Sequence, residues 1–177
     1  MQTGSNSKNK GYTLIELITV IAIMVILAGV GAVAFTNLAR WNVTKAAKSY
    51  DSGLSRAQVL GMSKDNAVIK LTKNGDHLEM TITNGTQQDS FRDLGNAKRI
   101  DVKYTDTAGN ETTLGDGDSL MLSYVRSSGA FLPIVTSVDT NGVPTTGSTY
   151  CKTITFSGAS KVKTITLYRY TGKHTLD

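Results

Sequence analysis

The sequence predicts an α+β protein in which one long N-terminal α-helix packs against an antiparallel β-sheet. Residues 12–63 contain no proline and begin with a long apolar run. After residue 63, short runs of alternating apolar and polar residues are separated by turns rich in Gly, Asn, Asp, Thr and Ser. With 17 Gly and 2 Pro in 177 residues, the composition is typical of a turn-rich β portion rather than a helical bundle. The chain is expected to divide into four parts: a short polar segment (1–11), an apolar helix half (12–39), an amphipathic helix half (40–63) and a β-rich globular head (64–177).

The apolar helix half has the length and composition of a membrane span. Residues 17–39 carry no charge, and this run suffices to cross a hydrocarbon core of about 30 Å at about 1.5 Å per residue. Lys8 and Lys10 on its N-terminal side place that end in the cytoplasm and the head outside. A secretory signal peptide is the alternative, but its apolar stretch is shorter, about 7–15 residues. We expect a single-pass membrane protein.

The amphipathic half carries small and apolar residues at spacings of three and four: Ala47, Tyr50, Leu54, Ala57 and Gly61. This spacing predicts one buried helix face. The two halves together predict a helix of about 50 residues, roughly 75 Å long, whose second half packs against the head.

Alternating runs predict the strands of the head. Asn74-Gly75 joins two of them, which is a strong hairpin signal, and Leu78, Met80 and Ile82 share one face of the second. Pro133 makes its strand an edge or a bulge. The predicted strands and hairpins cover residues 68–83, 99–105, 119–125, 131–137, and 151–157 with 161–170 around Gly158.

The residues that could take part in catalysis or metal binding do not form a recognisable catalytic pattern. Cys151 is the single cysteine, so it forms no internal disulfide, and we expect a small buried apolar residue. The chain has no recognisable metal-ligand cluster, phosphate-binding glycine loop or nucleophile motif. The net charge of +5 is more often a solubility feature than a sign of nucleic-acid binding. We expect no enzyme activity, no cofactor and no metal.

The segment Gly11-Tyr12-Thr13-Leu14-Ile15-Glu16-Leu17 carries the strongest functional signal. Glu16 is an ionisable group at the start of an apolar segment, and a carboxylate within a bilayer costs at least ~2.5 kcal/mol unless it finds a partner. Cleavage after Gly11 would give Tyr12 a new α-ammonium group four residues from Glu16. That amine, or the amine of a neighbouring subunit, could pair with the carboxylate and set the register of an assembly.

This segment resembles the class III signal of type IV pilins and type II secretion pseudopilins. The resemblance implies that a prepilin peptidase cleaves between Gly11 and Tyr12, that Tyr12 is N-methylated, and that Glu16 guides assembly. Residues 1–11 would then be the leader peptide. Tyr12 stands where the family most often has Phe. The implied partners are other pilin subunits, the peptidase, the cytoplasmic membrane and an assembly platform, and the implied product is a cell-surface or periplasm-spanning filament.

Residues 54–71 are similar to the helix end and first strand of pseudopilin H/FimT-like minor pilins, through Arg56 and Asn66, and this favours a minor subunit. Two alternatives remain open: a pseudopilin of a type II secretion system, and a minor pilin that binds DNA through a basic C-terminal region. The residues for the second are Lys161, Lys163, Arg169 and Lys173. Alternating Lys and Thr is also the ordinary composition of a solvated edge strand.

Overall fold

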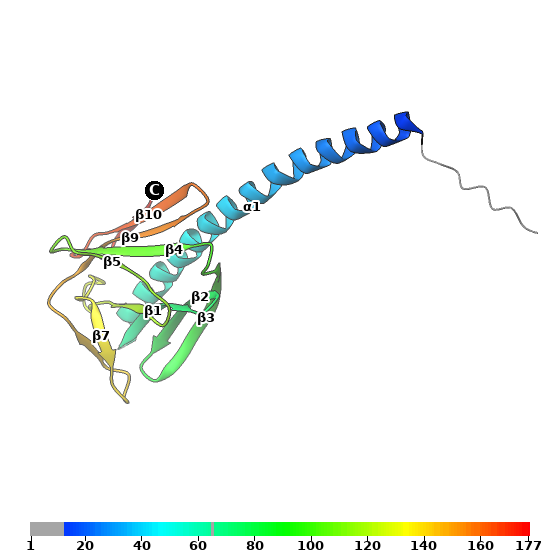
Figure 1. The fold of residues 1–177 in the computed structure, drawn as a ribbon. Coiled ribbons are helices and arrows are strands. Elements are labelled where there is room, and N and C mark those ends of the chain that lie inside the picture. Colours follow the sequence, from blue (N-terminus) through cyan, green and yellow to red (C-terminus); the bar gives the residue numbers. More distant parts are fainter. Residues whose placement is uncertain (1–12, 65) are drawn as a thin grey trace, which may run out of the picture. The chain divides into compact units, whose positions relative to one another are not determined.

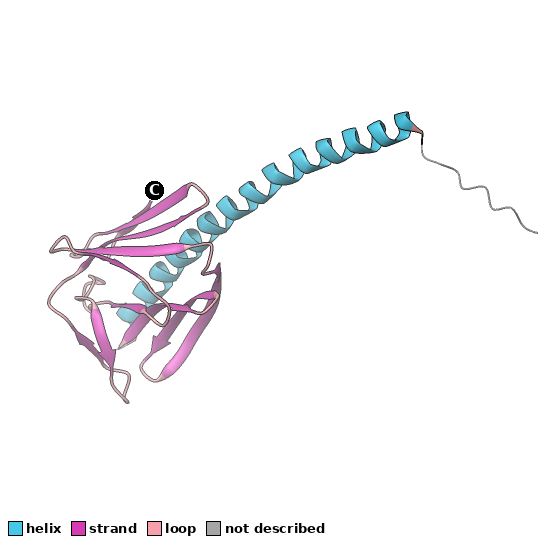
Figure 2. Cartoon of the chain, viewed as in Figure 1, coloured by secondary structure: helices cyan, strands magenta, loops and turns pink. Residues whose placement is uncertain are grey.

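The computed structural model describes residues 13–64 and 66–177, without the side chains of residues 30–40. The chain divides after Asn37 into two compact units. The predicted α+β class is confirmed: one helix, α1 (Leu14–Ser63), is followed by antiparallel strands (Figures 1 and 2). The predicted leader and the Gly11–Tyr12 bond lie outside the described residues.

The strands form two sheets in the second unit. The first is six-stranded in the order β3-β2-β1-β6-β7-β8, and the second is five-stranded in the order β11-β10-β9-β4-β5. All of their pairings are antiparallel. The strands are β1 (Ala67–Asn74), β2 (His77–Asn84), β3 (Gln87–Asn96), β4 (Asp101–Asp106), β5 (Glu111–Thr113), β6 (Ser119–Ser123), β7 (Val135–Val138), β8 (Pro144–Thr146), β9 (Cys151–Gly158), β10 (Lys161–Leu167) and β11 (His174–Leu176).

The second half of α1 packs against both sheets, as the spacing of its apolar residues predicted. Its buried face consists of Val43, Ala46, Ala47, Tyr50, Gly53, Leu54, Ala57 and Gly61. The Tyr50 ring lies 5.8 Å from the ring of Phe156 on the five-stranded sheet. Gly53 lies against Met80 of the six-stranded sheet, and a side chain at this position would collide with it. One helix face therefore joins the two sheets in a single core.

Two predicted hairpins are confirmed. Strands β1 and β2 pair from Ala67↔Asn84 to Asn74↔His77, and Gly75 in their turn has a φ of +57°, which glycine adopts without strain. The other is β9–β10, in which Lys161 pairs with Gly158. The inward face predicted for β2 is also correct, since its three apolar residues are buried.

The predicted strand at 131–137 is only partly present. Phe131 makes a single bridge with Tyr124, and the regular strand β7 begins after Pro133, at Val135. Because proline has no N–H to donate to a neighbouring strand, pairing is interrupted there. Strands β3, β5, β8 and β11 were not predicted. They are short or lie largely exposed at sheet edges, so their sequences do not alternate.

Candidate functional site

The structure describes the start of α1 from Thr13 onward. Thr13 precedes the helix, and its Oγ1 accepts a hydrogen bond from the backbone N–H of Glu16 at 3.3 Å. This is the arrangement of a helix N-cap. Glu16 lies in the first turn, where a negative charge is favoured by the helix dipole. Within residues 13–64 and 66–177, its carboxylate has no hydrogen-bond or ion-pair partner.

The helix turns that follow Glu16 expose apolar side chains on every face. Eleven large apolar residues between Leu14 and Leu27 have exposed fractions of 46–78%. Contiguous apolar surface of this kind marks a site of contact with another protein or a membrane. Within the described part of the chain, no helix has both the length and the apolarity needed to cross a membrane. The predicted apolar half extends through residues 30–39, whose side chains are outside the description.

The comparison with protein families identifies this N-terminal segment. Residues 6–32 match the model of the prokaryotic N-terminal methylation motif. The chain carries the N-terminal signal of a type IV pilin-like protein. The match includes Gly11, Tyr12 and Glu16, and it supports a prepilin-peptidase substrate and a membrane-anchored precursor. Comparison with curated proteins and with solved structures gives no match.

The four basic residues predicted as a C-terminal patch fall into two groups. Lys161 and Lys163 lie at the β9–β10 turn, at the start of the seven-residue strand β10. Arg169 and Lys173 lie in the turn after its other end, roughly 20 Å away at about 3.3 Å per residue. In the second group the Arg169 guanidinium lies 4.2 Å from the Tyr170 ring, and Lys173 lies over Tyr168 at 6.0 Å. The four basic residues therefore do not form one continuous patch.

A Ser, a His and an Asp meet where β11 lies beside α1. Ser55 Oγ lies 3.1 Å from His174 Nε2, and Asp51 Oδ1 lies 3.6 Å from the same nitrogen. In a catalytic triad the acid contacts the other ring nitrogen, Nδ1. Here Nδ1 lies 3.4 Å from the Gly172 carbonyl oxygen. The cluster thus connects the C-terminal strand to the helix and lacks the geometry that activates a serine.

Three further residues with reactive or charged side chains, Cys151, Asp116 and Asp118, are buried in the core or hydrogen-bonded in turns. Cys151 is buried and free, as expected, and burial, with a smaller effect of the Asp106 charge, raises the pKa of its thiol to about 12. Asp116 and Asp118 accept hydrogen bonds from the backbone N–H groups of Gly75 and Gly115, a common role of Asp in turns. Within the described residues no group of three or more His, Cys, Asp and Glu side chains could hold a metal ion.

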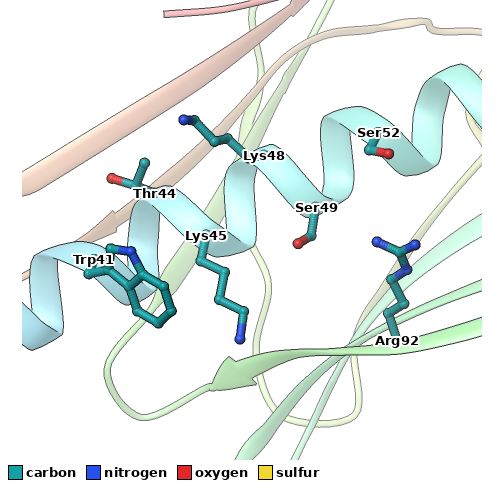
Figure 3. Close-up of a pocket in the computed structure, with 7 residues that line it drawn as sticks. All are labelled: Trp41, Thr44, Lys45, Lys48, Ser49, Ser52 and Arg92. Atoms are coloured by element: carbon teal, nitrogen blue, oxygen red, sulfur yellow. The ribbon is translucent and has the colours of Figure 1, made fainter.

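One surface feature was not predicted from the sequence. Trp41, Lys45 and Lys48 on α1 and Arg92 on β3 line an open groove (Figure 3). Arg92 belongs to a strand that the sequence pattern did not indicate, and only its pairing with Met80 of β2 places it near the helix. The helix residues alone gave no sign that a strand would complete a basic groove.

Proposed function

We propose that this chain is a structural subunit, of the minor type, of a type IV pilus or a related filament, and that it has no catalytic activity. It would be anchored in the cytoplasmic membrane, cleaved by prepilin peptidase between Gly11 and Tyr12, methylated on Tyr12, and assembled through its N-terminal helix. Its partners would be other pilin subunits and the assembly platform. The filament would lie at the cell surface or span the periplasm.

The observation that carries the proposal is the exposed apolar surface between Leu14 and Leu27. Burying one fully exposed large apolar side chain stabilises by about 1.5–3 kcal/mol, so these eleven side chains, which are 46–78% exposed, represent roughly 10–20 kcal/mol of unfavourable exposure. This is comparable to or larger than the typical net stability of a domain, about 5–15 kcal/mol. This apolar surface must be shielded from water. Lipid would shield it before assembly, and sister helices would shield it in the filament. Glu16 would then meet the amine of Tyr12 in its own chain or in a neighbour.

Processing tests this proposal directly. Co-expression with a prepilin peptidase should shorten the chain by residues 1–11, and mass spectrometry should find a methylated Tyr12 at the new N-terminus. Gly11→Leu should leave the precursor uncut. Gly29→Ala is the matched control, since no described side chain lies within 4 Å of the position of its added methyl group, and it should be processed normally. Recovery of the wild-type chain with its first eleven residues attached, in the presence of active peptidase, would contradict the proposal.

A type II secretion pseudopilin would show the same processing, because the signal and the helix are the same in both classes. Purification of the assembled filament from cells separates the two. A subunit of a pilus is recovered in sheared surface fibres, whereas a pseudopilin stays with the cell envelope.

Nucleic-acid binding is a second candidate, supported by the aromatic and cationic cluster after β10. Tyr170 is 76% exposed beside Arg169, and exposed aromatic rings with nearby cations are the elements that bind single-stranded nucleic acid. Titration of the detergent-solubilised full chain with single-stranded DNA tests it. Arg169→Gln combined with Tyr170→Ala should abolish binding, while Lys161→Gln should leave most of it. Absence of binding at low salt excludes this candidate.

A further inference from the structure

The exposed indole of Trp41 stands at the edge of the basic groove. Trp41 is 59% exposed, and Lys45 Nζ lies 5.3 Å from the centre of its ring. Arg92 approaches the same groove from β3, while the Lys48 amine points away from it (Figure 3). The groove has a volume of about 320 Å³, at the small end of ligand-sized sites. Hydroxyl groups complete its lining, from Thr44, Ser49 and Ser52.

The groove holds positive charge without a matching negative charge. None of its lining residues is acidic. In the part of the chain that the structure describes, Lys45, Lys48 and Arg92 form no ion pair with a carboxylate. By contrast, Arg56, one helix turn beyond Ser52, is paired with Asp89 at 2.8 Å. The charge complementarity of the groove therefore favours an anionic ligand.

The β9–β10 turn adds further basic and apolar side chains at the same end of the head. Gly158 at this turn packs against Val43, two residues after Trp41, and a Cβ atom on Gly158 would lie 3.2 Å from Val43 Cγ2. Beyond the turn, Val162 is 57% exposed between Lys161 and Lys163. Two acids lie beside this hairpin: Asp101, opposite Ser157, and Asp177, which exchanges backbone hydrogen bonds with Thr164. This end of the head thus carries Lys45, Lys48, Arg92, Lys161 and Lys163 against these two carboxylates, together with an exposed Trp and an exposed Val.

We propose that this end of the head, defined by Trp41, Lys45, Lys48, Arg92 and the β9–β10 turn, is a docking surface for the headgroups of anionic phospholipids. The inference rests on the proposed function, in which the preceding apolar segment lies in the membrane before assembly. Trp41 follows the last residues of that segment in the sequence, so it enters the headgroup region, where Trp is enriched. The cations contact lipid phosphates, and each one near an anionic membrane raises binding about fivefold.

The surface has a consequence for assembly. A subunit that is docked on the membrane has its head held at one depth, with the apolar helix in lipid. Extraction into a filament then breaks the headgroup contacts together with the lipid contacts of the helix. Anionic lipid therefore holds back unassembled subunits. An increase in salt releases the head, because added salt shortens the Debye length from about 10 Å at 0.1 M to about 3 Å at 1 M and so weakens attraction between solvent-exposed charges.

The chain provides its own probe for a test, since Trp41 is its single tryptophan. The full chain is reconstituted into vesicles of phosphatidylcholine, with or without phosphatidylglycerol, each containing the same fraction of a lipid with a nitroxide on its headgroup. We expect stronger quenching of Trp41 fluorescence in the phosphatidylglycerol vesicles. Lys45→Gln combined with Arg92→Gln should reduce this difference, because two of the five cations lose their charge. Arg169→Gln combined with Lys173→Gln, an equal charge change at the opposite end of β10, should retain it.

The outcomes separate this inference from the proposed function. If the chain floats with both kinds of vesicle but Trp41 is quenched equally in them, the lipid surface is wrong and the membrane anchor stands. If the chain floats with neither, the anchor and the surface both fail. If Trp41 is shielded in neutral vesicles only as the density of protein rises, a sister subunit covers the groove and the lipid assignment is overturned. Circular dichroism of each variant checks that the exposed substitutions leave the fold unchanged.

Discussion

Two buried tyrosines provide a sharp test of how the helix is held on the head. Both lie in the core, with exposed fractions of 0% for Tyr50 and 4% for Tyr124. The Tyr124 hydroxyl donates a hydrogen bond of 2.9 Å to the backbone carbonyl of Leu54 on α1. The Tyr50 hydroxyl has no hydrogen-bond partner among the residues that the structure describes. The same change, removal of one oxygen, should therefore have different consequences at the two positions.

The magnitudes follow from the cost of burying a polar group. Tyr124→Phe should lower the free energy of unfolding by about 1 kcal/mol, the typical net contribution of one hydrogen bond. Tyr50→Phe removes a hydroxyl whose burial without a partner costs about 1–3 kcal/mol, so it should leave stability unchanged or raise it. For a domain of this size, a difference of 1 kcal/mol corresponds to about 3–5 °C in melting temperature.

Thermal unfolding of the full chain in detergent, followed by circular dichroism, measures both variants. The expected order of melting temperatures is Tyr50→Phe at or above wild type, and wild type above Tyr124→Phe. Equal destabilisation by the two variants would refute the reasoning, because it would mean that the Tyr50 hydroxyl has a partner as good as the Leu54 carbonyl.

Three further predictions concern other parts of the head. Leu54→Ala should lower the free energy of unfolding by about 2–5 kcal/mol, since it opens a cavity in the core. In the same thermal unfolding assay, Ser52→Ala, a change at an exposed position, should alter the free energy of unfolding by no more than about 0.5 kcal/mol. Similar effects of both variants would contradict the described packing. The hydrogen bond that His77 donates to the Asp93 carboxylate raises the pKa of His77. The charged pair therefore stabilises the fold below the ordinary His pKa of about 6.5, and this contribution is lost as the pH rises through the higher folded value. An NMR titration should find that higher value, Asp93→Asn should bring it down, and an unchanged titration in the variant would exclude the pair. Because the pKa of the Cys151 thiol is raised from 9.0 to about 12, its thiolate fraction falls roughly a thousandfold. A thiol reagent should therefore label the native protein far more slowly than the unfolded protein. Equal labelling rates would show that the thiol is accessible in the native protein.

The sequence predicted the parts of the fold that depend on local pattern. The spacing of Ala47, Tyr50 and Leu54 identified the buried helix face because a helix brings positions three and four apart onto one side. Asn74-Gly75 identified a hairpin because a tight turn needs a residue that adopts positive φ. Both features depend on residues that are close together in the sequence, and tertiary packing did not override these local preferences.

Features that depend on distant pairing were not predictable in this way. Strand β3 has a largely polar sequence and an exposed edge, so it lacks the alternation that marks a half-buried strand. Its pairing with β2 is what places Arg92 beside the helix, and the basic groove depends on that contact. Likewise, Lys161 and Arg169 look close in the sequence, but an extended strand separates them. The candidate processing site was recognised from an ordered motif, and its first residues lie outside the described part of the chain.

Glu16 provides the most direct measurement of the central claim, that the exposed apolar helix assembles subunits with a carboxylate as its register device. Cells expressing Glu16→Gln, Glu79→Gln or the wild-type chain would be sheared, and the subunit quantified in filaments against the processed pool in the membrane. Glu79→Gln is an equal charge change on the head. We expect normal cleavage of all three chains, with filament incorporation strongly reduced for Glu16→Gln alone. Wild-type incorporation of the Glu16→Gln chain would show that the carboxylate does not set the register.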